Sequence, residues 1–148
     1  MGLSGILHNE LLLSAVLAWA AAQLLKLILN LVNSKKFNLE LLWSSGGMPS
    51  SHSAAVCALA VAAGLSYGFE HYAFALSALL ALIVMYDACG VRREAGEHAR
   101  ILNRLEDMLF SETLTPEEKL KELIGHTPLQ VVFGALLGIL VALALFFL

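Results

Sequence analysis

The stretch that decides the fold runs from residue 46 to residue 89 and reads GGMPSSHSAAVCALAVAAGLSYGFEHYAFALSALLALIVMYDAC. A short polar loop leads into one apolar segment, 53–69, and a second apolar segment follows at 72–89. Only Glu70 and His71 separate the two segments, so they must form a tight antiparallel hairpin of helices. Polar backbone at a membrane boundary is tolerated only when it is capped, hydrated or lining a site. The loop before the hairpin is therefore the first candidate for a site.

The composition of the whole chain is that of a membrane protein. Of the 148 residues, 59% are hydrophobic and only 14% are charged, whereas a soluble domain of this length would carry more charge and shorter apolar runs. A helix needs roughly 17–25 residues to cross a bilayer, and two further apolar segments meet this length. The sequence thus predicts an all-α fold in which residues 1–148 form a single membrane domain. The domain is an integral membrane four-helix bundle, with spans at 11–32, 53–69, 72–89 and 129–148.

The polar parts of the chain set its orientation. Residues 90–126 contain apolar and charged positions that recur at helical spacing on opposite sides, which predicts a cytoplasmic amphipathic helix at the membrane surface between the third and fourth spans. Eight of the nine basic residues lie in this stretch or in the loop 34–51, and the ninth is Lys26 in the first span. By the positive-inside rule both loops are cytoplasmic and both termini lie on the outer side.

Four separate stretches of the sequence bring costly polar groups to the cytoplasmic end of the bundle. The groups are Lys26 in the first span, His52 before the second, Asp87, Arg92 and Arg93 at the end of the third, and His126 before the fourth. Each has a plainer explanation when taken singly: a capped loop, a lysine that reaches the headgroups, or a structural ion pair. Ionisable groups at membrane depth are expensive, and their convergence at one end favours a functional site.

Short motifs in these stretches resemble known signatures. One motif reads Pro49-Ser50-Ser51-His52, and it looks like Pro-Ser-Gly-His, the second signature of the type 2 phosphatidic acid phosphatases. A second begins at His126 and looks like the tail of their third signature, while Lys26 followed by Asn33-Ser34 echoes the first, Lys-x6-Arg-Pro. With the segment 86–93, these pieces resemble more closely the divergent branch of that superfamily, which is related to acid phosphatases and vanadium-dependent haloperoxidases. The resemblance covers nearly the whole chain.

The resemblance implies a phosphate site built around two histidines. His126 would be the nucleophile that attacks phosphorus and forms a phosphohistidine, and His52 would protonate the leaving oxygen. Positive charge and loop groups would hold the phosphate, namely Lys26, Gly46, Gly47, Ser50, Ser51, Arg92 and Arg93, with Asp87 orienting one arginine. Phosphoryl transfer depends mainly on an aligned nucleophile and fixed positive charge. No metal, cofactor or nucleic-acid partner is expected.

The chain departs from the family pattern in a way that leaves two questions open. Gln130 stands where the family has the Asp that orients the nucleophilic imidazole, and glutamine can accept the ring N–H but supplies no negative charge. A rival nucleophile is His98, which follows Arg92 at the Arg-to-His spacing of the third signature. We favour His126, because it precedes Pro128 and an apolar helix as in the family.

The function that the resemblance implies is a membrane lipid-phosphate phosphatase of phospholipid metabolism. It would hydrolyse a lipid phosphomonoester or diphosphate without a metal, with the lipid phosphate and the bilayer as its partners. The alternative is a catalytically inactive membrane protein that keeps the phosphate cradle and binds anionic lipids or assists assembly. Gly134 and Gly138 form a GxxxG motif that could pair with a second copy, so a homodimer is also expected.

Overall fold

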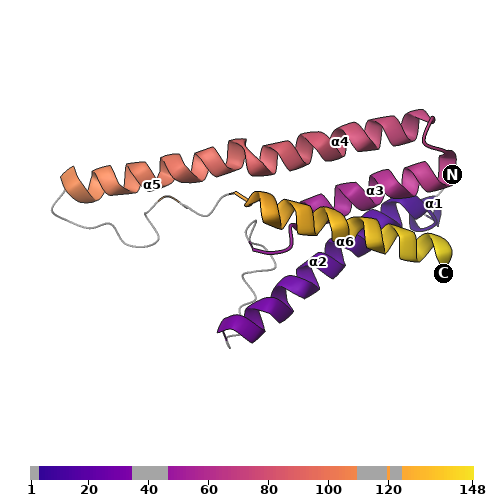
Figure 1. Cartoon of the computed structure of the whole chain (residues 1–148), viewed down its shortest axis with the longest axis horizontal. Coiled ribbons are helices and arrows are strands. Elements are labelled where there is room, and N and C mark those ends of the chain that lie inside the picture. Colours follow the sequence, from indigo (N-terminus) through magenta and orange to yellow (C-terminus); the bar gives the residue numbers. More distant parts are fainter. Residues whose placement is uncertain (1–3, 35–46, 110–119, 121–124) are drawn as a thin grey trace.

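The computed structural model describes residues 4–34, 47–109, 120 and 125–148, and within these ranges the chain forms helices joined by turns, with no strand (Figure 1). The helices are α1 (Ser4–Leu7), α2 (Glu10–Ser34), α3 (Ser51–Tyr67), α4 (Tyr72–Cys89), α5 (Val91–Leu109) and α6 (Pro128–Phe147). Three helical stretches are long and apolar enough to cross a membrane: Glu10–Val32, Tyr72–Leu109 and Pro128–Phe147. The apolar α3 is shorter, at 17 residues. The predicted all-α membrane fold is thereby confirmed.

The helix ends are set by local chemistry that the sequence carries. Ser50 caps α3, where its hydroxyl accepts a hydrogen bond from the Ser53 backbone N–H, and the helix ends at Gly68, whose φ of +96° is readily adopted only by glycine. His71 caps α4 in the same manner through its ring nitrogen. The turn between α3 and α4 is thus short and capped on both sides, as the hairpin prediction required.

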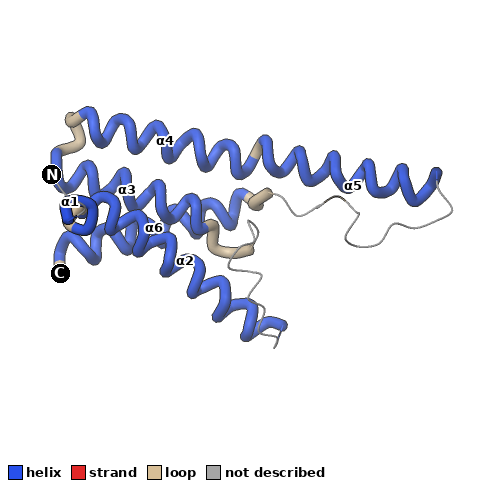
Figure 2. The backbone as a smooth tube through the Cα atoms, turned by 180° about the vertical axis from the view of Figure 1, so that it is seen from behind, coloured by secondary structure: helices blue, strands red, loops and turns tan. Residues whose placement is uncertain are grey.

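Helix α3 occupies the centre of the bundle and packs against α2, α4 and α6 (Figures 1 and 2). The contacts are made by small side chains, and the buried cluster consists of Ala18, Ala22, Ala54, Ala58 and Ala142. Large apolar side chains instead face outward, among them Leu24, Ile28, Leu76, Ile83 and Leu140. This arrangement of small residues inside and large ones outside suits a bilayer. Lipid tails are as apolar as leucine, so there is no hydrophobic gain from moving leucine into the protein interior.

The GxxxG motif of α6 is used within the chain. Gly134 and Gly138 are buried, and a Cβ on either would clash with the carbonyl oxygens of Ser50 and Ala54 in α3. The two helices approach this closely because neither glycine has a side chain. Within one chain the glycine face of α6 is therefore occupied by α3, and the homodimer stays a prediction.

Helix α5 follows α4 with only Gly90 between them. The hydrogen-bond ladder continues across this residue, since Gly90 N–H donates to the Tyr86 carbonyl at 2.8 Å and the Glu94 N–H donates to the Gly90 carbonyl at 3.0 Å. As a result α5 continues the direction of α4 and extends beyond the bundle (Figures 1 and 2). The predicted amphipathic helix is present, but it does not turn away from α4 as a helix lying along the membrane surface would.

Candidate phosphate site

Two histidines from distant parts of the sequence face each other at one end of the bundle. His52 lies in the first turn of α3, and His126 lies in the loop that leads into α6. Their ring centroids are 6.5 Å apart and the ring planes are nearly perpendicular, at 84°. This separation and angle lie within the range of an edge-to-face contact between two rings. The sequence predicted this pairing, and the geometry brings the two side chains together.

Backbone hydrogen bonds fix the position of His126. Its N–H donates to the carbonyl of Ala88 near the end of α4, at 3.1 Å, and the Ser50 N–H donates to the Gln130 carbonyl at 3.0 Å. The preceding residue, Gly125, lies against the backbone of Arg93, where a Cβ would stand 2.6 Å from the Arg93 Cα. These contacts tie the loop before α6 to the ends of α3, α4 and α5.

The imidazole of His126 is buried without a hydrogen-bond partner. The residue is only 3% exposed, and within the described part of the chain neither Nδ1 nor Nε2 makes a hydrogen bond. Buried polar atoms are nearly always paired, so two unpaired nitrogens on one ring call for a missing ligand or water. Burial, followed by the positive charges of Lys26, His52 and Arg92, lowers the pKa of His126 to about 4. The ring is therefore neutral at pH 7, with a lone pair on one nitrogen.

Lys26 brings a buried positive charge to the same end of the bundle. It is 4% exposed, and the described residues place no carboxylate within ion-pair distance of its ammonium group. Its aliphatic stem lies alongside Gly47, where a Cβ would stand 3.7 Å from the Lys26 Cδ. Gly47 has a φ of +94°, which explains the glycine at this position. A buried cation without a protein counter-ion is costly, and an anionic ligand would remove that cost.

Arg92 is the second cation near the histidines, and Asp87 holds it. The Arg92 Nε donates to Asp87 Oδ2 at 2.6 Å, and both side chains are partly exposed. The predicted role of Asp87 in orienting an arginine matches this contact. Arg93 differs, because its side chain is exposed and its contact with the loop before α6 is made by its backbone.

The predicted loop ligands have mixed outcomes. Ser50 is fully buried, and its hydroxyl accepts hydrogen bonds from the Ser53 N–H and the Ser53 hydroxyl, so it serves the helix cap. Ser51 is 2% exposed and begins α3. Gly47 borders Lys26, whereas Gly46 lies outside the described residues. The loop therefore contributes its shape and backbone to the site more than its hydroxyl groups.

Gln130 does not orient the His126 ring as the sequence comparison suggested. Its side-chain oxygen accepts a hydrogen bond from the Thr127 N–H at 3.0 Å, and the Thr127 hydroxyl accepts one from the Gln130 N–H at 3.4 Å. This pair is a capping box that starts α6. The sequence could have predicted this role, because Thr127 followed three residues later by glutamine is the signature of a capping box.

The rival histidine lies elsewhere. His98 is on an exposed face of α5, and no ring contact joins it to His52, which pairs instead with His126. The part of the chain that the structure describes contains no group of three or more His, Cys, Asp or Glu side chains placed to hold a metal ion. Sequence reasoning did not identify the Ala88 carbonyl as the anchor of His126, since a backbone contact leaves no trace in residue types.

Comparison with known proteins agrees with the family that the sequence resembles. The family model described as "Divergent PAP2 family" matches residues 7–141. A relative from Bacillus subtilis (strain 168), the uncharacterized membrane protein YuiD, is 43% identical over 151 residues, which cover 95% of this chain and 96% of that protein. No solved structure matches the chain. The chain belongs to the divergent PAP2 family of membrane proteins.

Proposed function

We propose that this protein is a lipid-phosphate phosphatase whose active site is formed around His52 and His126. The observation that carries the proposal is the buried His126 ring, which has no hydrogen-bond partner on either nitrogen and faces a second imidazole. Lys26 and Arg92 supply positive charge beside it. A neutral nucleophile, a facing acid and two cations are the groups that phosphoryl transfer requires.

The chemistry proceeds in two steps on these residues. In the first, the lone pair of the neutral His126 ring attacks phosphorus, the bond from phosphorus to the lipid oxygen breaks, and His52 gives a proton to that oxygen. In the second, water attacks the phosphohistidine, His52 takes a proton from the water, and the bond between phosphorus and His126 breaks to release inorganic phosphate. Lys26 and Arg92 stabilise the negative charge that spreads over the phosphoryl oxygens in both steps.

An apolar groove that reaches Asp87 supports a lipid as the substrate. The groove has a volume of about 770 Å³ and is lined by Leu82, Ile83, Met85, Tyr86, Asp87, Cys89, Val91 and Val131. It runs along α4 toward Asp87, the residue that holds Arg92. α4 and α6 touch each other sparsely while both pack along α3, so the groove lies where their surfaces diverge. A lipid phosphate would lay its chain in the groove and its phosphate at Arg92.

The placement of the site on the cytoplasmic side is part of the proposal. It rests on the basic residues, of which none occurs in residues 1–25, 37–91 or 122–148. With both termini on the outer side, the His52 and His126 end would face the inner leaflet. Cysteine labelling of single-cysteine variants in intact cells and in inverted vesicles would test this orientation, and accessibility of the His126 loop from outside the cell would contradict it.

Phosphate release from a panel of lipid phosphates tests the activity. Purified protein in nanodiscs is given a phosphatidic acid, a phosphatidylglycerol phosphate and a polyprenyl diphosphate, and inorganic phosphate is measured. We expect turnover of at least one, its loss in His126→Ala and His52→Ala, and its retention in His98→Ala. Unaltered turnover in His126→Ala, with the variant folded by circular dichroism, would remove His126 from the mechanism.

A second candidate function is favoured by one observation, the engagement of Gln130 in the capping box of α6. With no side chain polarising His126, the site around His52 and His126 would bind an anionic headgroup without hydrolysing it. In that case wild-type protein would bind vesicles containing phosphatidic acid, Lys26→Met would weaken this binding, and none of the lipid phosphates would release phosphate. Turnover by the wild-type protein would exclude this candidate.

A further inference from the structure

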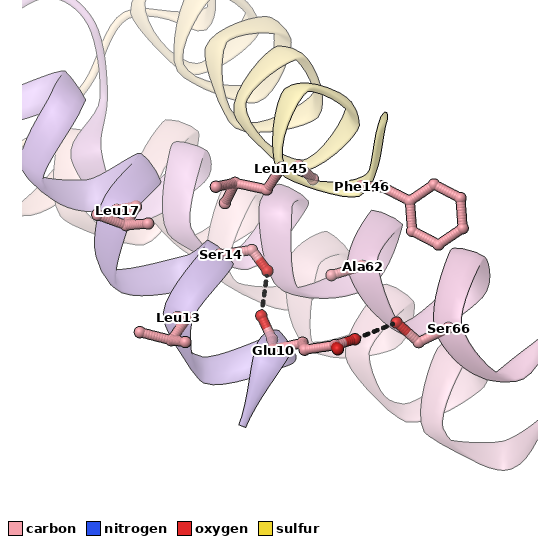
Figure 3. A pocket seen from close by; sticks show the side chains of 9 residues that line it. Glu10, Leu13, Ser14, Leu17, Ala62, Ser66, Leu145 and Phe146 are labelled. Atoms are coloured by element: carbon pink, nitrogen blue, oxygen red, sulfur yellow. Dashed lines mark hydrogen bonds between the residues drawn. The ribbon is translucent and has the colours of Figure 1, made fainter. Parts of the chain in front are cut away.

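Two adjoining cavities lie at the end of the bundle opposite the histidines. The first, of about 220 Å³, lies between α2, α3 and α6 and is mostly apolar, with Leu13, Leu17, Ala62 and Phe146 in its lining (Figure 3). The second, of about 390 Å³, is mostly polar and is lined around the start of α2. Glu10 and Ser66 border both cavities. An apolar space and a polar space that share a carboxylate have the layout of a site for an amphiphile.

The carboxylate of Glu10 is held at the boundary between the two cavities. Its Oε2 accepts a hydrogen bond from the Ser66 hydroxyl of α3 at 3.4 Å, and Figure 3 shows the side chain reaching from α2 toward α3. Ser14, one turn further along α2, is 2% exposed and donates to the Glu10 backbone carbonyl at 2.7 Å. Ser14 is thereby satisfied by the helix itself, which leaves Glu10 as the charged group of the site.

The charges at the Glu10 end of the bundle favour a positively charged ligand over a negatively charged one. On α2 the nearest basic residue is Lys26, which lies about 24 Å along the helix at 1.5 Å per residue. No Lys or Arg occurs in residues 1–25 or 50–91, whereas Glu10 and Glu70 both fall at this end. A phosphate or carboxylate headgroup would be repelled by the Glu10 carboxylate, although His8 also lines the polar cavity. A protonated amine would find a carboxylate at the mouth of an apolar cavity, where the reduced dielectric strengthens the attraction.

We propose that these cavities form a binding site for an amphiphile with an aliphatic chain and a protonated amine. The chain lies in the apolar cavity between α2, α3 and α6, and the amine contacts Glu10 from the polar cavity. The inference does not rest on the phosphatase proposal, since the two sites share no residue and lie at opposite ends of the helices. A loss of one function therefore leaves the other open to measurement.

Binding of four small probes to the full-length protein in nanodiscs tests the site. The probes are n-octylammonium, n-octanol, n-octanoate and ethylammonium. Their binding is measured by isothermal titration calorimetry. We expect n-octylammonium to bind at least tenfold more tightly than n-octanoate, because only their charges differ in sign. Ethylammonium should bind at least tenfold more weakly than n-octylammonium, because it has no chain for the apolar cavity. Equal affinity for n-octylammonium and n-octanoate in the wild-type protein would overturn the proposal without any variant.

Variants locate the binding. Glu10→Gln should remove the preference for n-octylammonium over n-octanol, and Ala62→Phe should weaken both by filling the apolar cavity. Glu70→Gln is the matched control, because it removes a carboxylate from the same end outside both cavities, and it should leave the preference intact. His126→Ala should also bind as the wild-type protein does. Unchanged binding in Glu10→Gln, or an equal loss in Glu70→Gln, would show that the amine binds elsewhere.

Discussion

The two ends of this bundle are built from the same helices but carry opposite charge. At one end Lys26 is buried beside His126. Among the described residues neither ring nitrogen of His126 has a hydrogen-bond partner, and no carboxylate forms an ion pair with Lys26. At the other end Glu10 is the charged group, and it is hydrogen-bonded to Ser66. Burial of unpaired polar groups is expensive, and this supports the proposal that the first end binds an anionic ligand. The second end is anionic, and its charge favours a cationic ligand.

The largest expected effect of this difference is on catalysis. His126→Ala should lower kcat for lipid-phosphate hydrolysis by about 10³-fold or more, since it removes the nucleophile. Glu70→Gln, at the opposite end, should change kcat by less than about twofold. Phosphate release by purified variants in nanodiscs measures both. Comparable losses in the two variants would mean that the substitutions lower activity by damaging the fold and not by changing the histidine site.

The pH at which His126 titrates sharpens the contrast between the ends. Because burial and neighbouring positive charge hold its pKa at about 4, against an ordinary value of 6.5, the ring should stay neutral through physiological pH. Its folded pKa is depressed, so its contribution to stability is full above pH 6.5 and is lost as the pH falls toward 4. NMR of ¹⁵N-histidine-labelled protein, assigned with His126→Ala, measures the midpoint. A midpoint near 6.5 would contradict a buried, cation-flanked ring.

Lys26 should affect function and stability in opposite directions. Lys26→Met keeps the shape of the stem and removes the charge, so kcat/KM should fall by about 10²-fold or more. The same change should raise the free energy of unfolding by about 1 kcal/mol, because it relieves a buried charge without a carboxylate partner. Unfolding by denaturant in micelles and lipid-phosphate turnover give the two values. A destabilised Lys26→Met variant would indicate that Lys26 is paired in the native protein.

The close contact between α3 and α6 should be sensitive to a single methyl group. Gly138→Ala places a Cβ against the Ala54 carbonyl and should cost about 1–3 kcal/mol of stability as the helices move apart. Gly5→Ala is the control, because a Cβ there meets no atom within 4 Å. Equal stability of the two variants would mean that the helices separate without cost. A change in oligomeric state in Gly138→Ala alone would assign the motif to an interface between copies.

Much of the fold could be predicted from the sequence, because the length and apolar composition of a segment identify it as a membrane span. The apolar segments placed the four helices of the bundle, and the two-residue link placed the α3–α4 hairpin. The convergence of Lys26, His52, Asp87 and His126 followed from the alternation of spans. The motifs that resemble the divergent PAP2 branch contain the same residues, and the family model confirms the family.

Other features depend on contacts that residue types do not specify. Gln130 has two possible uses, at His126 or in a helix cap, and only geometry shows that Thr127 engages it. The GxxxG motif fits an internal partner as well as an external one, and the choice of α3 depends on the tertiary packing. The direction of α5 depends on whether Gly90 bends the chain, and the continuing hydrogen bonds keep it straight.

In the proposed mechanism His126 receives the phosphoryl group, and covalent trapping tests this most directly. Protein in nanodiscs is mixed with ³²P-labelled lipid phosphate, quenched in alkali to preserve phosphohistidine, and mapped by proteolysis and mass spectrometry. The account predicts label on the peptide containing His126 and none in His126→Ala. Label on the peptide containing His98, or turnover without any labelled histidine, would contradict it.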